Sequence, residues 1–317
     1  MVQPCWLVKG FCLRCSSINI NLRNLTRAGD RDTPSLRGKT NIWRDFVSGK
    51  KKEVVWPVLP PGISLTDTHC HLDMDDYQDD YRQVIDNAVK CGVQRIITIG
   101  IDLESSRKAI ELAASDEHIY ASVGVHPHNV SGLIVDHYDE LRRLAASPKV
   151  VGFGEIGLDL VKSYAPVAEQ KEHFKRQVTL AKELDLPLIV HDREAHVEVM
   201  EILAQAAPFP AGGVMHCFSG DPALAKQVMS LGFYLSVPGV VTFNKAETMQ
   251  EVVRTVPLSS LLLETDGPYL APVPRRGKRN EPALLLFTAA RVAELKGVSL
   301  GEVASATTAN ACRLFGF

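Results

Sequence analysis

One strand–helix–strand unit can be read from residues 213–238, which have the sequence GVMHCFSGDPALAKQVMSLGFYLSVP. The apolar runs at 213–218 and 233–238 predict two strands, because such runs pack well on a buried, pleated surface. Residues 221–231 show a helical pattern, in which Asp221 supplies an N-cap and Pro222 occupies the first helical position. Two strands joined by a helix indicate a right-handed crossover between parallel neighbours.

The same alternation is repeated along the chain from residue 63 onward. Strand signals lie at 63–69, 95–101, 119–125, 150–156, 187–191, 213–218, 233–238 and 261–265. Helical patterns lie at 77–90, 104–114, 136–146, 168–185, 194–206, 221–231 and 244–255. Eight such units in about 255 residues predict a closed (β/α)8 TIM barrel over residues 63–317. The alternative is an open doubly wound sheet, but no glycine-rich dinucleotide-binding motif follows the first strand.

Residues 1–62 differ in composition from the rest of the chain. They hold 11 Lys or Arg and 4 Asp or Glu, a net charge of +7, which leaves 24 and 33 and a net charge of −9 for the remainder. They show no sustained apolar period, so we predict an irregular basic N-terminal extension that adds no core and ends in a stiff linker at 56–62. The extension is either an organelle targeting leader or a dispensable segment, including one that follows a start codon assigned too far upstream.

The overall composition excludes several classes of protein. With 45% hydrophobic and 23% charged residues, the 317-residue chain has the profile of a globular protein. No apolar run reaches 18 residues, so we expect no membrane-spanning segment. The acidic body argues against a broad nucleic-acid-binding surface but allows a local phosphate site. Seven irregularly spaced cysteines favour a reducing compartment, so we expect a cytoplasmic protein, or an organellar one if residues 1–62 are a leader.

Metal-binding side chains stand at the predicted strand ends, which is where active sites of TIM barrels are built. These residues are His69, His71, His126, Glu155, His191, His216 and Asp266. Side chains alternate along a strand, so His69 and His71 point to the same face. Imidazole and carboxylate groups suit Zn, Mg or Mn, and the sequence therefore predicts a divalent-metal site at the C-terminal face of the barrel.

Five motifs reinforce this prediction. They are DTHCHLD at 67–73, GVHPH at 124–128, GFGEIGLD at 152–159, HCFSG at 216–220 and ETDGPYL at 264–270. In this order they resemble the motifs of the TatD-type metal-dependent hydrolases, a family of amidohydrolase-like barrels. The resemblance covers residues 63–317 and leaves out residues 1–62.

The resemblance implies one or two divalent ions in each chain. One ion would be held by His69, His71, Glu155 and Asp266, and the other by Glu155, His191 and His216. Glu155 would bridge them, since a shared carboxylate can hold two ions about 3.5–4 Å apart, as two-metal hydrolysis requires. Asp266 would act as a ligand or would take a proton from the attacking water.

Two further sets of residues are candidates for substrate binding. His126 either contacts the substrate or orients a neighbouring group. Four cations follow the last predicted strand, where barrel enzymes frequently bind phosphate. They are Arg275, Arg276, Lys278 and Arg279. Because arginine suits bidentate contact with phosphate, we predict a phosphate clamp in this basic loop.

The function predicted first is that of a metal-dependent deoxyribonuclease that cleaves phosphodiester bonds with metal-activated water. We expect exonuclease-like action on single-stranded or frayed ends of DNA, and the choice of DNA comes from the resemblance. One alternative is a metal-dependent esterase or amidase, such as an aminoacyl-tRNA deacylase, because the same donors activate water against carbonyl carbon. Another alternative is a non-catalytic scaffold, which the complete set of metal donors disfavours.

Overall fold

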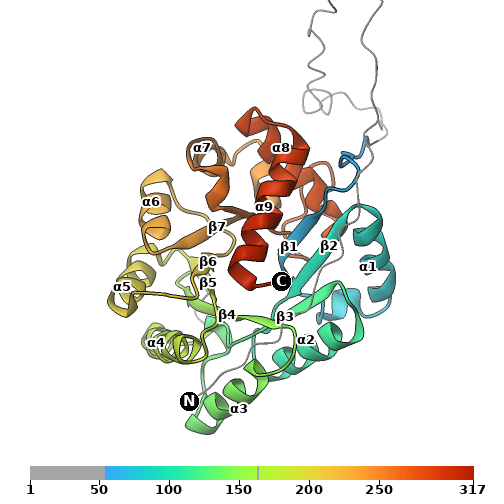
Figure 1. Cartoon of the computed structure of the whole chain (residues 1–317). Coiled ribbons are helices and arrows are strands. Elements are labelled where there is room, and N and C mark those ends of the chain that lie inside the picture. The colour runs from blue at the N-terminus through green and yellow to red at the C-terminus, as the bar shows by residue number, and fades with distance from the viewer. Residues whose placement is uncertain (1–53, 163) are drawn as a thin grey trace, which may run out of the picture. The chain divides into compact units, whose positions relative to one another are not determined.

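The computed structural model describes residues 54–162 and 164–317, and in this range eight parallel strands form a nearly closed barrel (Figure 1). The strands are β1 (Leu65–Cys70), β2 (Val93–Thr98), β3 (Ile119–Val123), β4 (Val150–Asp159), β5 (Leu188–Arg193), β6 (Gly213–Met215), β7 (Phe233–Val237) and β8 (Leu261–Leu263). Each strand pairs in parallel with the next one in the chain, from β1 to β8. The predicted (β/α)8 barrel is confirmed, with a strand at each predicted position.

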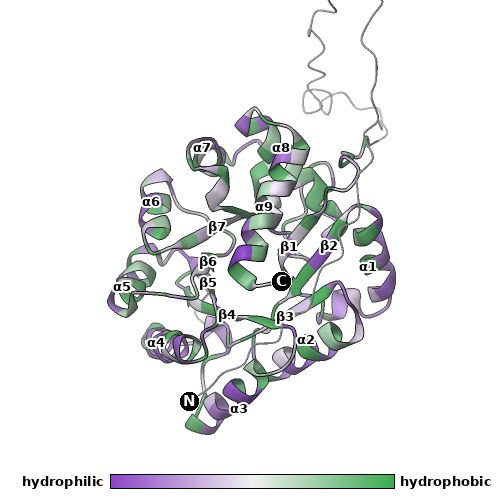
Figure 2. Ribbon diagram, viewed as in Figure 1, coloured by the Kyte–Doolittle hydropathy of each residue, from purple (hydrophilic) through white to green (hydrophobic). Residues whose placement is uncertain are grey.

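Helices follow the strands along the chain and surround them. They are α1 (Tyr81–Lys90), α2 (Leu103–Ser115), α3 (Val135–Ala145), α4 (Val167–Glu183), α5 (His196–Ala206), α6 (Pro222–Ser230), α7 (Glu247–Thr255), α8 (Leu285–Lys296) and α9 (Leu300–Phe315). Figure 2 shows hydrophilic and hydrophobic residues mixed along outer helices such as α1 and α3, which is typical of helices with one buried face. Among the described residues, no helix is both long and apolar enough to cross a membrane.

Hydrogen bonds outside the regular strand pairing join β1 to the chain that follows β8. The backbone N–H of Asp266 donates to the His69 carbonyl at 2.9 Å, and that of His71 donates to the Gly267 carbonyl at 2.7 Å. The buried Asp67 carboxylate accepts both the backbone N–H of Thr265 at 2.9 Å and its hydroxyl at 2.5 Å. The first and last strands are therefore tied together at the level of the predicted metal donors.

Helix α9 lies across the opposite end of the barrel, where the strands begin (Figure 1). The Thr308 hydroxyl donates to the Ser64 carbonyl at 3.0 Å, and the Asn310 amide donates to the Leu261 carbonyl at 2.8 Å. Side chains of α9 form one buried cluster with residues in or directly after the strands: Ile97, Ile99, Ile189, Val214, Leu262, Ala311, Leu314 and Phe315. The barrel is thus closed by packing at this end, and a cleft remains at the other.

The described part of the predicted linker does contribute to packing. Trp56 and Leu59 pack against the core, and the Trp56 ring lies 5.0 Å from the ring of Phe287 in α8. The expectation that the whole of residues 1–62 adds no core is therefore wrong for 54–62, because these two large side chains find apolar partners on the barrel. The predicted irregular extension over residues 1–53 lies outside the described residues.

Candidate metal centre

Three of the predicted donors come together where β1 and β8 end, and we call them the first donor group: His69, His71 and Asp266. The Nε2 atoms of the two histidines are 3.3 Å apart. Asp266 Oδ1 lies 3.7 Å from Nε2 of His69 and 3.5 Å from Nε2 of His71. All three side chains present a donor atom to one point, because alternation along β1 turns both histidines to the same face.

The second donor group consists of Glu155 in β4, His191 in β5 and His216, which directly follows β6. Glu155 Oε1 lies 2.6 Å from His191 Nδ1 and 2.9 Å from His216 Nε2. The two ring nitrogens are 3.4 Å from each other. The three predicted residues therefore meet within hydrogen-bonding distance.

Glu155 faces the histidines of both donor groups with different oxygens. Its Oε1 contacts His191 and His216, whereas its Oε2 lies 3.5 Å from His69 Nε2 and 3.9 Å from His71 Nε2. The residue is 3% exposed, so little solvent competes for either oxygen. A carboxylate in this position can contact two cations at once.

The spacing of the donors fits a divalent metal ion. Ligands about 2 Å from a tetrahedral ion lie roughly 3.3 Å from one another, close to the separations of 3.3, 3.5 and 3.7 Å in the first donor group. The residues present therefore match a metal site in both chemistry and geometry.

The electrostatic environment favours an ionised Glu155. Burial alone would raise its pKa, but the charge of His216 and the hydrogen bonds from His191 and His216 lower it well below the ordinary value. Burial lowers the pKa of His69, which keeps that ring neutral and able to bind metal. Burial also tends to lower the pKa of His216, but the Glu155 and Glu264 carboxylates raise it well above the usual value. A metal ion bound by His216 would therefore displace a proton.

Three buried carboxylates that the sequence analysis did not assign to the site lie behind the donors: Asp67, Asp159 and Glu264. Asp159 Oδ2 is 3.6 Å from His191 Nε2, and Glu264 Oε1 is 3.5 Å from His216 Nδ1. Carboxylates in such positions orient histidine ligands and increase their basicity. The sequence did contain a signal for two of them: Asp159 and Glu264 are acidic residues at the end of an apolar strand, within the GFGEIGLD and ETDGPYL motifs.

A glycine allows β4 and β5 to approach each other at the second donor group. Gly157 has a φ of +153°, and a Cβ at this position would lie 1.9 Å from the backbone oxygen of His191. Any side chain here would push the two strands apart. The close approach keeps His191 within reach of Glu155.

His126, predicted to bind substrate, also lies at the centre. Its Nε2 is 3.6 Å from Glu155 Oε1, and these two residues with His191 form another cluster of possible donors. However, its Nδ1 accepts the backbone N–H of His128 at 3.1 Å. Because burial lowers its pKa well below the ordinary value, the ring is neutral and carries its proton on Nε2. His126 therefore presents an N–H to the site, as a residue that orients substrate would.

The four cations of the predicted phosphate clamp lie elsewhere. A cleft of about 580 Å³ contains donors of both groups, and none of the four described cations lines it. The guanidinium groups of Arg275 and Arg276 lie over the rings of Trp56 and Phe243, at 5.8 and 4.6 Å. Arg279 forms an ion pair with Asp80 at 2.6 Å. The contacted residues Trp56, Phe243 and Asp80 do not line the cleft either, so the structure does not bring the three arginines to the donors.

Comparison with known proteins is consistent with this site. Residues 66–316 match the model of the family described as TatD related DNase. YabD of Bacillus subtilis, named an uncharacterized metal-dependent hydrolase, is 42% identical over 251 residues, which cover 79% of this chain and 98% of that protein. The protein named 3'-5' ssDNA/RNA exonuclease TatD of Erwinia tasmaniensis is 34% identical over 260 residues, which cover 80% and 98%.

A solved structure shares the same architecture. The crystal structure of YJJV, a TatD homologue from Escherichia coli K12, aligns with a TM-score of 0.76 and 32% sequence identity. The alignment covers 80% of this chain and 98% of that one. The family match runs from β1 to the residue that follows α9 and so includes every donor described above.

Proposed function

Since this chain belongs to the TatD related DNase family of metal-dependent hydrolases, we propose that it is an exonuclease that removes nucleotides from ends of single-stranded DNA. The observation that carries the proposal is the position of Glu155, whose two oxygens face separate groups of metal donors. Two cations that share a carboxylate suit in-line displacement at phosphorus, because one side of the reaction centre can activate water while the other neutralises the leaving oxygen.

We assign each residue of the centre a role in this reaction. His69, His71 and Asp266 would hold one divalent ion, Mg, Zn or Mn, and His191 and His216 would hold a second, with Glu155 shared between them. Bound divalent ions supply a lowered pKa for water and neutralisation of charge on the phosphodiester oxygens.

The other steps belong to the protein side chains. Asp266, whose pKa is lowered by the hydrogen bond from His71 and by neighbouring histidine charges although burial opposes this, is ionised and can take a proton from water. His126 offers its Nε2–H to a non-bridging phosphate oxygen.

Single-stranded ends are favoured by two considerations. The cleft of about 580 Å³ is the size of a small-molecule site, so it accommodates a strand terminus more readily than a duplex. One relative of 34% identity is named as a 3'-5' exonuclease of single-stranded DNA and RNA. These considerations support the same substrate class that the sequence motifs suggested.

The test uses the full-length protein, stripped of metal and then supplied separately with Mg, Mn or Zn. A single-stranded DNA oligonucleotide labelled at its 5' end should shorten step by step, and excess chelator should abolish the reaction. Covalently closed single-stranded circles should resist, because they have no end. Cleavage of circles would contradict exonuclease action. Release of amino acid from aminoacyl-tRNA with no action on any DNA would favour the esterase alternative.

A further inference from the structure

The cleft contains two basic side chains whose positions indicate where a nucleic-acid strand binds. Lys162, which follows β4, and Arg193, at the end of β5, are the Lys and Arg side chains among the described residues that line it. Both are exposed. The carboxylates in the cleft already have partners: Glu155 and Asp266 face histidines, as described above, and Asp192 accepts from His196 Nδ1 at 2.8 Å.

Asp159 connects both residues to the second donor group. Its Oδ1 accepts the backbone N–H groups of Val161 and Lys162, each at 2.9 Å, and so holds the start of the loop that carries Lys162. Its Oδ2 lies 3.8 Å from Arg193 Nη1 and 3.6 Å from His191 Nε2. The position of the two cations is therefore coupled to the second donor group through a single buried carboxylate.

Two exposed tyrosines lie beside histidines of the cleft: Tyr269, which lines the cleft, and Tyr164, which lies against His128. The Tyr164 ring, in a side chain 67% exposed, meets the His128 ring nearly at right angles with centroids 4.8 Å apart, and Lys162 Nζ lies 5.8 Å from its centre. Tyr269 is 53% exposed, and its ring lies 6.3 Å from that of His71. Cations combined with exposed aromatic rings are the usual means of binding a single strand, because phosphates pair with the cations and unpaired bases stack on the rings.

We propose that Lys162 and Arg193 bind a backbone phosphate next to the one that is cleaved, and that Tyr164 stacks on an adjacent unpaired base. The proposal rests on the exonuclease function proposed above and specifies its substrate as a single-stranded polynucleotide with at least two phosphates. It also assigns the phosphate-binding role to these two residues and not to the basic loop at 275–279.

The test compares two phosphodiesters, a single-stranded oligonucleotide and bis(p-nitrophenyl) phosphate, which lacks a second phosphate and a base. We compare kcat/KM for the oligonucleotide with kcat/KM for the small ester. The double variant Lys162→Gln with Arg193→Gln should lower the ratio of the first to the second by at least about tenfold. The slope of log KM against log salt concentration should fall by roughly 0.7 for each phosphate that the variant no longer neutralises.

Stacking and charge can be separated by a second variant. Tyr164→Leu should raise KM for the oligonucleotide about tenfold and leave the salt slope unchanged, since base stacking on a tyrosine ring releases no counterions. An abasic nucleotide at the stacking position should remove this difference between the variant and the wild type. A salt slope that changes in Tyr164→Leu would overturn the assignment of stacking.

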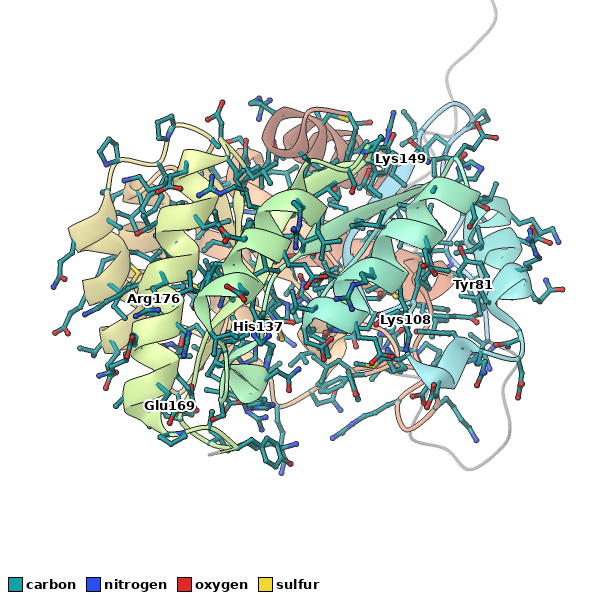
Figure 3. The ribbon with its side chains drawn as sticks, turned by 90° about the horizontal axis from the view of Figure 1, so that it is seen from below. Tyr81, Lys108, His137, Lys149, Glu169 and Arg176 are labelled. Atoms are coloured by element: carbon teal, nitrogen blue, oxygen red, sulfur yellow. The ribbon has the colours of Figure 1, made fainter. Side chains whose placement is uncertain are left out.

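The matched control is Lys108→Gln with Arg176→Gln, which removes the same charge from the outer helices α2 and α4 (Figure 3). This control should keep the wild-type ratio and salt slope. The inference would be overturned if the Lys162/Arg193 variant and the control had the same ratio of kcat/KM for the oligonucleotide to that for the small ester. It would also be overturned if the salt slope fell only after neutralisation of Arg275, Arg276 and Lys278. A wild type that hydrolyses the small ester but no oligonucleotide would refute the proposed function and this inference together.

Discussion

At the scale of single residues, Glu155 is the side chain on which the centre depends most. Glu155→Gln retains the shape but removes the charge shared by the two donor groups, so we expect kcat to fall by at least about 100-fold. The number of divalent ions bound per chain, measured by elemental analysis after dialysis, should fall as well. Glu104→Gln, in an exposed ion pair with Lys108 on α2, is the matched control and should behave as the wild type.

Wild-type turnover and metal content in Glu155→Gln would show that the carboxylate is not shared between ions. Loss of turnover with unchanged metal content would instead limit Glu155 to positioning of His191 and His216. The two measurements therefore separate a bridging role from a purely structural one.

A second residue-scale prediction concerns Asp67, a fully buried residue of β1 whose carboxylate contacts Thr265. Burial raises its pKa to about 7, although the hydrogen bonds from Thr265 oppose the change. Between the ordinary value of about 4 and this value, the native state binds more protons than the unfolded state. The contribution of Asp67 to the free energy of unfolding should therefore fall as pH rises from about 4 to about 7, by up to roughly 4 kcal/mol.

Asp67→Asn tests this linkage, because the amide keeps an oxygen for the backbone N–H groups and cannot ionise. Urea unfolding of both metal-free proteins at several values of pH between 4.5 and 7.5 gives the difference in stability. We expect the free energy of unfolding of Asp67→Asn to increase relative to that of the wild type as pH rises. A constant difference over this range would contradict the raised pKa.

At the scale of elements, we expect α9 to contribute to the stability of the barrel and not to catalysis. Phe315 is 6% exposed and packs with strand residues at the end of the barrel remote from the metal donors. Phe315→Ala should lower the free energy of unfolding by about 3–5 kcal/mol, measured by denaturant titration. The kcat of the folded fraction should stay within about twofold of the wild type. Val298→Ala, at a more exposed position just before α9, should cost under about 0.5 kcal/mol.

A large loss of kcat in folded Phe315→Ala would show that packing at the closed end transmits to the metal centre. The structure favours the opposite expectation, because the donors sit on strand ends tied together by Asp67, Thr265 and the backbone of His69 and His71.

At the scale of the whole molecule, the relevant boundary lies at residue 54. We expect deletion of residues 1–53 to leave the melting temperature within about 2 °C, because that segment shows no periodic apolar pattern. Deletion of residues 1–62 also removes Trp56 and Leu59 from the core, worth about 1–3 kcal/mol, and should lower the melting temperature by roughly 3–8 °C. Calorimetry of both truncated chains in the presence of metal provides the comparison, and identical melting temperatures would place the boundary at 63.

Much of the fold could be predicted because periodicity is a local property of the chain. All eight strands were located from apolar runs, and seven helices from the patterns between them. Helices α8 and α9 were missed, and for α8 the reason is clear: buried residues such as Leu285, Leu286, Phe287 and Thr288 occupy most of its circumference. An amphipathic contrast, the signal used for the other helices, is therefore weak there.

The sequence by itself determined that the seven predicted metal-binding side chains gather at the centre, because the carboxyl ends of parallel strands meet at one end of a barrel. Only the tertiary structure decided that Glu155 turns one oxygen to each donor group and that Asp159 lies behind His191. It also placed Arg275 and Arg276 on aromatic rings and left Lys162 and Arg193 in the cleft. The orientations of these side chains depend on contacts between residues far apart in the chain, and neither the spacing of residues nor the composition encodes such contacts.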